Sequence, residues 1–427
     1  MKNRRVVVTG MGVVAPNGIG LAAFEEALRR GRSGIQHFEE LERLKFGCQI
    51  GGLPDLSEEK KREYFTELEL NRLKASGIIY GVMAGMDAWQ HAGLSMPEKD
   101  AEADWESGCV FGAGLAGAEV MRDAAYMVDE GKVKRMGSTT VPQVMSSGVS
   151  AYLGGKLGLG NQVTTNASAC STGSESLLMG YERIMAGRAE RMICGGCDSS
   201  GPYVWGGFDA MRVTNRRFND EPTRASRPMS ATARGFVPGG GGGALLLESY
   251  ESAQQRGAAI YAEFLGGYVN SGGQQNGGTM TAPNPAGIVR CIRGALRAAG
   301  ITAHQLDAIS GHLTSTMFDP IEIRQWTEAL GRAGGDFPYI NSLKSMIGHC
   351  LSAAGAIESV AVVLQLHQGF LHPSINCEDL HPDIAARIDP TRIPRTEMSL
   401  PLNIMAKSSF GFGDVNSCVI FSKNIQD

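Results

Sequence analysis

The sequence lacks several features that would place it in a specialised class of protein. No stretch approaches the roughly 20 consecutive apolar residues that a membrane-spanning helix needs, and the glycine-broken start is too short for a secretory signal. The charges nearly cancel, with 40 Lys and Arg against 44 Asp and Glu, which argues against a surface devoted to nucleic acid. The nine cysteines are an odd, scattered set, typical of reduced thiols rather than a disulfide framework. These absences predict a cytoplasmic protein without a membrane span.

The composition is that of a large folded protein. The 427 residues are 43% hydrophobic, enough for a sizeable core, and the length suits two domains or one large duplicated domain. Strand-like and helix-like stretches alternate in both halves, which predicts an α/β fold with mixed or parallel sheets covered by helices. Five consecutive glycines, residues 239–243, run into a strand at residues 244–247, which predicts a close backbone crossing near a functional centre.

The N-terminal strand ends in a pattern that nicotinamide enzymes also use. Residues 5–9 form a β-branched run that predicts a buried strand, and Gly10, Gly12 and Ala15 then match a GxGxxA fingerprint. In dinucleotide-binding folds that turn leads straight into a helix. Here a Pro-Asn-Gly turn delays the helix to about Gly20, so we do not expect a bound nucleotide.

Several stretches have the apolar spacing of helices. Residues 21–30 predict an amphipathic helix, and residues 60–74 predict one charged helix that continues into an apolar one at residues 75–92. Residues 141–157 predict a further helix. Residues 212–233 are polar and contain proline, so we expect an excursion over the surface.

One cysteine lies where a nucleophile is expected. Residues 163–165 are β-branched, residues 174–188 have helical spacing, and Cys170 stands between them among small residues. Small neighbours let a substrate carbonyl reach the sulfur and let backbone N–H groups face a developing oxyanion. The positive end of the following helix favours the thiolate. An isolated cysteine more often has a buried structural role, so the assignment depends on the residues that accompany Cys170.

Three stretches in the second half carry further reactive or flexible residues. They are SGHLTST (residues 310–316), NSLKSMIGHC (residues 341–350) and SSFGFGDVN (residues 408–416). The first places His312 among hydroxyl residues at a strand end. In the second, Lys344 and His349 bracket a glycine turn, and Glu358 follows in a helix of small residues. We expect the third to be a mobile aromatic–glycine loop before the final strand.

In this order, the motifs resemble the β-ketoacyl-acyl-carrier-protein synthases, the Cys-His-His condensing enzymes of fatty-acid and related polyketide synthesis. The resemblance covers essentially the whole chain and rests on RRVVVTGMG, VP, SACSTG, SRP, GFV, HLTST, LKSMIGH, AAGAIES and SFGFG. It implies a thiolase-like α/β fold, five-layered α/β/α/β/α, with two pseudo-duplicated halves. Residues 1–257 would carry the cysteine, and residues 258–427 the histidines, the lysine and a gating loop.

The resemblance also implies a role for each reactive residue. Cys170 would be the nucleophile that accepts the acyl group. His312 and His349 would be neutral imidazoles that stabilise the enolate oxygen of a malonyl thioester and assist its decarboxylation. Lys344 would organise the histidine pair, and Glu358 would be the buried acid that supports it.

Substrate contacts are implied in the same way. Phe412 matches the gating phenylalanine, and its backbone N–H would form an oxyanion hole with that of Cys170. Thr314 and Thr316 match threonines that bind the pantetheine arm. The resemblance implies neither a metal nor a cofactor of the chain's own, because the phosphopantetheine arrives on the acyl carrier protein.

The implied partners are acyl- and malonyl-loaded acyl carrier proteins and a second ketosynthase subunit. Carrier proteins are acidic, so a chain of net charge -4 needs a local basic patch. Arg72, Lys74, Arg216 and Arg217 align approximately with basic contact positions of the family. A homodimer is expected, and a heterodimer with a paralogue is the alternative.

The sequence also departs from the family pattern. Arg234 and Gly240 stand where acidic residues are usual, Leu313 and Asp414 stand where glycines are usual, and an acidic residue common in the loop at residues 271–279 is missing. These changes leave open the substrate, the gating and any structural cation. They fit a specialised paralogue at least as well as a housekeeping elongase.

Two other functions are weighed against elongation. A non-catalytic, chain-length-determining partner subunit typically lacks the nucleophile, which Cys170 supplies here. A coenzyme-A thiolase needs a second cysteine in a CxGxG loop, whereas Cys418 lies on the final strand. Condensing enzymes that prime chains from acyl-coenzyme A carry asparagine where His349 stands. Acyl length, saturation and pathway stay open.

Overall fold

Two halves of the chain form the same five-stranded arrangement. The computed structural model describes residues 4–423. The first half contributes β1 (Val6–Ala15), β5 (Ser107–Ala113), β6 (Val163–Thr164), β7 (Arg191–Asp198) and β8 (Gly241–Ser249). The second half contributes β9 (Ala262–Ser271), β10 (Ala308–Ser310), β11 (Tyr339–Asn341), β14 (Ile404–Gly411) and β15 (Val415–Ser422).

The strand order in space shows that the two halves are duplicates of each other, although no repeat is visible in the sequence. The orders are β1-β8-β7-β5-β6 and β9-β15-β14-β10-β11, so each half places its first, fifth, fourth, second and third strands side by side. Strand directions agree as well: the first two pairings of each half are antiparallel and the last two parallel. Antiparallel pairing of β1 with β9 joins the halves.

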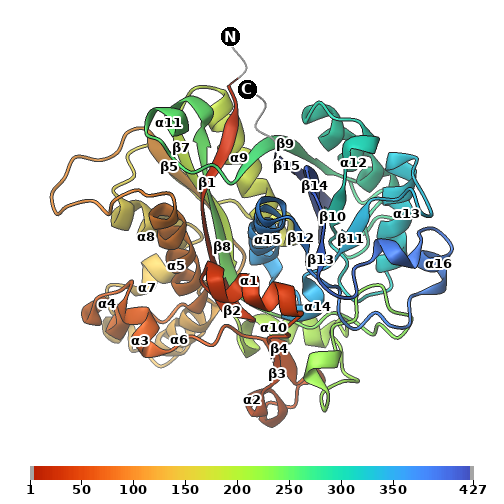
Figure 1. The fold of residues 1–427 in the computed structure, drawn as a ribbon. Helices are drawn as coiled ribbons and strands as arrows, with labels where there is room; N and C mark the ends of the chain where they lie inside the picture. The colour runs from red at the N-terminus through yellow and green to blue at the C-terminus, as the bar shows by residue number, and fades with distance from the viewer. Residues whose placement is uncertain (1–3, 424–427) are drawn as a thin grey trace.

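Helices make the remaining layers of the thiolase-like fold (Figure 1). The central layer consists of α9 (Thr172–Met185) and α15 (Ala354–Gln368), which contact each other and strands of both halves. On the outer faces, α5 (Ser76–His91) and α8 (Gly148–Leu157) cover the first half, and α12 (Pro285–Ala298) and α13 (Asp319–Leu330) the second. The result is α/β/α/β/α.

The remaining elements are shorter or peripheral. The helices are α1 (Leu21–Arg30), α2 (Glu39–Arg43), α3 (Glu58–Arg62), α4 (Glu67–Arg72), α6 (Ala118–Asp129), α7 (Thr140–Val144), α10 (Pro202–Ala210), α11 (Tyr250–Gln255), α14 (Lys344–Ile347) and α16 (Pro382–Ala385). The strands are β2 (Gly18–Ile19), β3 (Ile35–His37), β4 (Ile50–Gly52), β12 (Phe370–Leu371) and β13 (Met398–Ser399). Within residues 4–423, no helix is both long and apolar enough to cross a bilayer.

The glycine run lets β8 approach the central helix closely, as the sequence predicted. A Cβ on Gly243 would lie 2.5 Å from the backbone nitrogen of Ile357 in α15. On the opposite face, a Cβ on Gly242 would lie 2.7 Å from the carbonyl oxygen of Tyr80 in α5. Beside this strand, every residue from Ala354 to Leu366 is buried, as expected of a helix enclosed on all sides.

Two stretches predicted as single helices each contain two helices. The stretch at residues 60–74 is α3 followed by α4, because Thr66 caps the second helix in a capping box with Glu69. The stretch at residues 141–157 is likewise split into α7 and α8. The helices predicted at residues 21–30 and 75–92 are confirmed as α1 and α5.

Two other predictions are wrong in part: the surface excursion at residues 212–233 and the mobile loop at residues 408–416. Residues 225–230 are buried rather than on the surface, because Ser226 Oγ donates to the Lys344 carbonyl and the guanidinium of Arg227 pairs with Glu378 and Asp379. Residues 408–411 belong to β14 rather than to a mobile loop. Only the turn at residues 412–414 lies between the last two strands.

Candidate active site

Cys170 and His349 lie near the starts of the two equivalent central helices. Each lies at the start of a central helix: Cys170 in the 3-10 turn Ala169–Ser171 before α9, and His349 just ahead of the 3-10 turn Leu351–Ala353 before α15. Ala169 and Leu351 have φ values of 49° and 51°, in the left-handed region that costs a non-glycine residue free energy. The duplicated fold thus brings the starts of both central helices to the same site.

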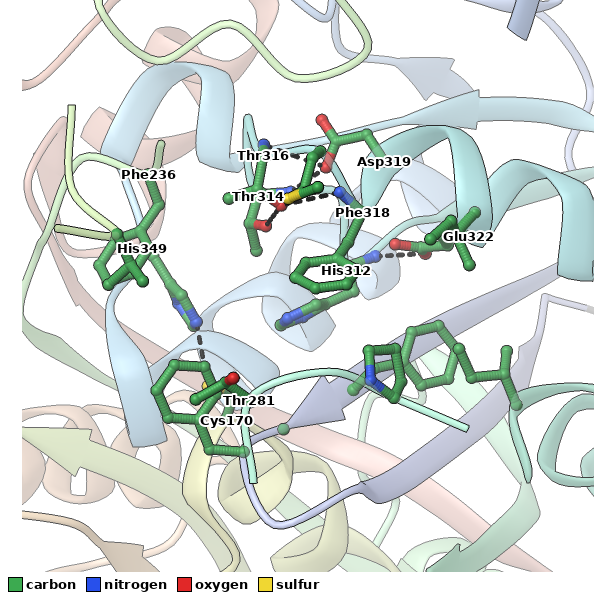
Figure 2. Close-up of a pocket in the computed structure, with 18 of the residues that line it drawn as sticks. Cys170, Phe236, Thr281, His312, Thr314, Thr316, Phe318, Asp319, Glu322 and His349 are labelled. Carbon is green, nitrogen blue, oxygen red and sulfur yellow. Dashed lines mark hydrogen bonds between the residues drawn. The ribbon is translucent and has the colours of Figure 1, made fainter. Parts of the chain in front are cut away.

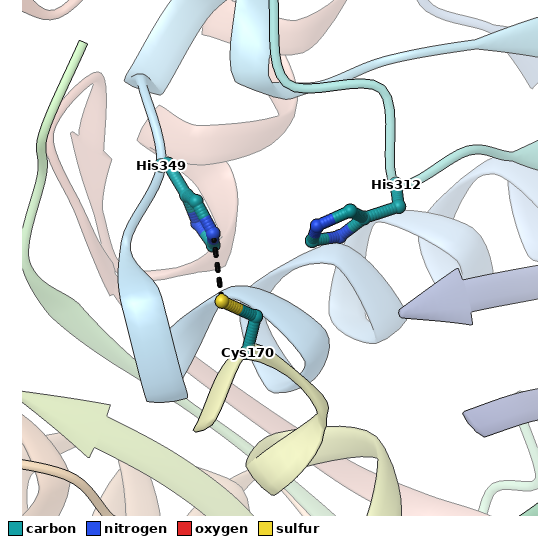
Figure 3. A group of neighbouring side chains, drawn as sticks. All are labelled: Cys170, His312 and His349. Atoms are coloured by element: carbon teal, nitrogen blue, oxygen red, sulfur yellow. Dashed lines mark hydrogen bonds between the residues drawn. The ribbon is translucent and has the colours of Figure 1, made fainter. Parts of the chain in front are cut away.

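The cysteine and both histidines meet there. His349 Nε2 lies 3.1 Å from Cys170 Sγ, and the His312 ring centroid lies 5.4 Å from that of His349. Figure 3 shows both rings beside the sulfur. The Leu351 N–H donates to His349 Nδ1, so in the neutral ring the proton resides on Nε2, facing the sulfur.

Burial favours the thiol form of the resting sulfur, although the helix start favours the thiolate as the sequence indicated. Burial raises the pKa of Cys170 to about 11. The backbone N–H groups of Phe412 and Cys170, which face the sulfur, and the charge of Lys344 all lower that pKa, but less than burial raises it. The helix start therefore stabilises negative charge without outweighing the low-polarity surroundings.

Both histidines are held in the neutral form, as the sequence predicted. Burial lowers the pKa values of His312 and His349 well below 6.5, and the positive charges of Lys344 and Lys407 lower them further. The buried His312 Nδ1 makes no hydrogen bond within the described structure. A neutral ring nitrogen that carries its proton can donate to a substrate oxygen.

A buried ion cluster lies behind the histidines. Lys344 Nζ is 2.5 Å from Glu358 Oε1, and both side chains are 1% exposed. Lys407 Nζ, fully buried on β14, is 2.8 Å from Glu358 Oε2. The predicted pair of Lys344 and Glu358 is therefore joined by a second lysine, which sequence reasoning missed. A lysine among small and apolar residues at 404–411 was the available signal.

Two buried carboxylates hold the His312 loop. Glu322 accepts the backbone N–H groups of His312 and Leu313, each at 2.7 Å. Asp319 accepts those of Thr314 and Ser315, and burial raises its pKa to about 7. Sequence reasoning missed both acids; their signal was their position at the start of α13, directly after the HLTST motif.

These residues line a cavity of about 310 Å³ with mainly apolar walls (Figure 2). Cys170 and His349 lie at one side, and Thr314 and Thr316 line another part with their hydroxyl oxygens 3.0 Å apart. Phe236, for which the sequence suggested no role, packs its ring edge-on against His349 at 5.4 Å. The cavity can hold an apolar chain next to a reactive thiol.

The backbone of Phe412 and its side chain both face this site. Its N–H lies close enough to the Cys170 sulfur to lower the pKa of the thiol, and its half-buried ring lies 6.1 Å from that of Phe208 at the cavity wall. The N–H groups of Phe412 and Cys170 both lower the pKa of the Cys170 thiol, and their role as an oxyanion hole stays a prediction.

The four basic residues predicted to dock a carrier protein are exposed and do not line the cavity. Arg72 ends α4, and Lys74 follows it two residues later. Arg216 pairs with Asp209 at 3.3 Å, and Arg217 adjoins it. Val213, three residues before Arg216, lines the cavity.

Each departure from the family pattern has a distinct setting. Arg234 is exposed and caps nearby carbonyls. Gly240 has no room for a side chain, since a Cβ would lie 2.7 Å from that of Ser200. Leu313 is buried in the core of the second half, and the Asp414 carboxylate accepts two backbone N–H groups from the loop that ends at residue 284.

The donor atoms of Cys170, His312 and His349 lie within 4.8 Å of one another, close enough for a metal ion. No other such group occurs among the residues that the structure describes. The set provides one sulfur and two imidazoles, so it offers no fourth protein ligand. The expectation of a metal-free site stays a prediction.

Comparison with known proteins identifies the fold and the family. Residues 3–253 match the beta-ketoacyl synthase N-terminal domain, and residues 261–378 match the C-terminal domain. The chain is 38% identical to the chloroplastic 3-oxoacyl-[acyl-carrier-protein] synthase II of Arabidopsis thaliana, over 99% of this chain and 76% of that protein. It is 34% identical to 3-oxoacyl-[acyl-carrier-protein] synthase 2 of Vibrio harveyi, over 99% of each.

Solved structures agree. A beta-ketoacyl synthase from Burkholderia phymatum superposes with a TM-score of 0.89 at 28% identity, covering 99% of this chain and all of the other. A type II polyketide ketosynthase, solved with its acyl-carrier protein and bound to the hexaketide, has a TM-score of 0.87 at 31% identity with the same coverage. The chain belongs to the β-ketoacyl synthase family of condensing acyltransferases.

Proposed function

We propose that this protein catalyses the decarboxylative condensation of an acyl group held on Cys170 with a malonyl unit carried by an acyl carrier protein. The observation that carries the proposal is the meeting of Cys170 Sγ and His349 Nε2 at 3.1 Å, beside His312 and at the wall of an apolar cavity. The reaction would elongate a fatty-acid or related polyketide chain.

The first step loads the enzyme. Cys170 sulfur attacks the carbonyl carbon of the acyl thioester, a new C–S bond forms, and the bond to the carrier's sulfur breaks. The thiol proton of Cys170 ends on the departing carrier thiol, so the step balances. The N–H groups of Phe412 and Cys170 would donate to the oxyanion of the tetrahedral intermediate, the same two donors that face the sulfur at rest.

The second step uses the histidines. The bond between the malonyl carboxylate and its α-carbon breaks, releasing CO2 and leaving an enolate. Its oxygen would accept hydrogen bonds from neutral His312 and His349. The enolate carbon attacks the acyl carbon on Cys170, a C–C bond forms, and the C–S bond to Cys170 breaks. The sulfur leaves as a thiolate and takes up a proton from solvent.

The substrate would enter on a carrier-protein arm. The hydroxyl groups of Thr314 and Thr316 lie in the cavity wall and suit hydrogen bonds to the amides of a pantetheine arm. The Phe412 ring would separate acyl loading from malonyl entry. The chain needs no cofactor of its own on this proposal, since the arm belongs to the carrier protein. The cytoplasmic location expected from the sequence stays a prediction.

Two features weigh against the other functions considered. The nucleophile is present and faces a histidine, unlike in a chain-length-determining subunit. Cys418, the candidate for a thiolase's second cysteine, is buried in β15 and does not line the cavity.

We propose that a second subunit covers an apolar surface on the first half. The support is a set of exposed apolar side chains around α6 and α7: Leu115, Met121, Tyr126, Val128, Val133, Val141, Met145 and Tyr203. A homodimer would bury these side chains, and a heterodimer is the alternative. Light scattering of the purified chain tests it, and a monomer at micromolar concentration contradicts the homodimer.

The function is tested with malonyl carrier protein and a panel of acyl carrier proteins, with products followed by mass spectrometry. Wild-type protein should release CO2 and give a product two carbons longer than the acyl donor. Cys170→Ala should yield no elongated product and no acyl adduct on the intact protein. Elongation by the alanine variant at the wild-type rate overturns the assignment.

A further inference from the structure

Lys407 is a buried cation to which the mechanism above gives no role. It lies on β14, its side chain is 0% exposed, and its Nζ is 2.8 Å from Glu358 Oε2. It also donates to the carbonyl oxygen of Ser408. Burying an ammonium group costs several kcal/mol unless it is paired, so its presence beside the reactive centre needs a reason.

The pairing has an unusual stoichiometry. Glu358, on α15, is bracketed by Lys344 from α14 at 2.5 Å and by Lys407 from β14 at 2.8 Å. One carboxylate therefore pairs with two ammonium groups from two other elements. Removing Lys407 would leave Glu358 Oε2 without its charge partner and remove one of the two contacts that fix the orientation of the carboxylate.

The cluster acts on the histidines through charge. Lys344 and Lys407 both disfavour protonation of His312 and His349. The acids that face the same centre are Glu358 on α15, Glu322 and Asp319 on α13, and Asp198 at the end of β7. Burial raises the pKa values of the last three, which weakens their opposing negative charge.

We propose that Lys407 is a positioning residue whose ammonium group fixes Glu358 and Lys344 and keeps both histidine rings neutral and in place. The inference rests on the proposed decarboxylation, because neutral rings matter only if they donate to an enolate. Burial lowers the pKa of Lys407 itself, but the carboxylates of Glu358 and Glu322 favour its charged form. Lys407 thus acts through its neighbours without touching the substrate.

The prediction separates the two half-reactions. In Lys407→Met, decarboxylation of malonyl carrier protein should fall at least about tenfold, because small displacements of groups that position a reaction cost that much or more. Acylation of Cys170 by a small acyl thioester should stay within about twofold. Without the second cation, the histidine pKa values rise, so decarboxylation should also fall as pH drops from about 8 to 6, where wild type stays level.

Three further variants distinguish this role from a loss of folding. Lys407→Gln keeps a polar side chain of similar length but no charge, and it should show the same pH dependence. In Lys407→Ala, ammonium ions should restore decarboxylation and tetramethylammonium ions should not, since only the former can donate to Glu358. Met405→Leu, a volume-conserving change at a buried site on the same strand, is the control for packing.

The outcomes distinguish this inference from the proposed function. If wild-type protein releases no CO2 from malonyl carrier protein, the function itself fails. If wild type does so, two results overturn the role of Lys407. One is an unchanged rate and pH profile in Lys407→Gln. The other is an equal loss of acylation and decarboxylation with no change in pH profile.

Discussion

Asp414 should hold the loop of residues 272–284 against the Phe412 turn, and replacing it should release that loop. The carboxylate is 1% exposed and accepts the N–H of Gln274 at Oδ2 and of Asn284 at Oδ1, each at 2.9 Å. Thr281, which lines the cavity, lies between these two donors in the chain. Asp414→Asn keeps only one accepting oxygen and turns an N–H group toward a backbone donor.

The size of the effect follows from those two hydrogen bonds. A hydrogen bond to a charged group contributes about 1.5–3 kcal/mol, and the variant loses one bond and the charge of the other. We expect the loop to be destabilised by about 2–4 kcal/mol. At about 1.4 kcal/mol for each tenfold change in an equilibrium constant, opening of the loop becomes roughly 30- to 700-fold more frequent.

Amide hydrogen exchange measures this opening directly. The N–H groups of Gln274 and Asn284 should exchange faster by that factor in Asp414→Asn. The Gly272 N–H, which donates to the main-chain carbonyl of residue 414, should change less and serves as an internal control. Asp414→Gly, which suits the φ of 61°, should release the loop in the same way. Unchanged protection at Gln274 and Asn284 in both variants would refute the reasoning.

Three further predictions follow from other parts of the molecule. Because burial raises the pKa of Cys170 to about 11, its alkylation by iodoacetamide should keep accelerating from pH 7 to above pH 9, and a plateau below pH 8 contradicts this. Gly243→Ala should lower the free energy of unfolding by about 1–3 kcal/mol in urea titrations, whereas Gly155→Ala, with open space around its Cβ, should not. Reversing the charges of Arg216 and Arg217 together should raise KM for carrier-protein substrates, and the increase should shrink at high salt. KM for a small pantetheine thioester should not change. An equal effect on both substrates would mean that these residues support the fold and not the docking of a carrier protein.

Local sequence patterns were sufficient for the elements whose periodicity is strong. The helices at residues 21–30 and 75–92 and the close approach of β8 at the glycine run could be predicted because they depend on spacing and side-chain size. The order of the motifs was also informative. It predicted that Cys170, His312 and His349 would meet, although they are separated by up to 179 residues.

What the sequence could not show depends on partners distant in the chain. The burial of Ser226 and of Lys407 is decided by contacts with Lys344 and Glu358, which no local window contains. The protonation state of Cys170 could not be predicted for a related reason. The helix start and the burial oppose each other, and only the folded structure shows that burial prevails.

The proposal that Cys170 accepts the acyl group and the histidines assist decarboxylation is tested most directly by His349→Ala. Intact-protein mass spectrometry measures acyl loading of Cys170, and CO2 release from malonyl carrier protein measures decarboxylation in the same preparation. The account predicts that the variant still accepts the acyl group, because the carrier thiol takes the proton of Cys170, while CO2 release falls to background. Loss of acyl loading with decarboxylation intact would contradict it.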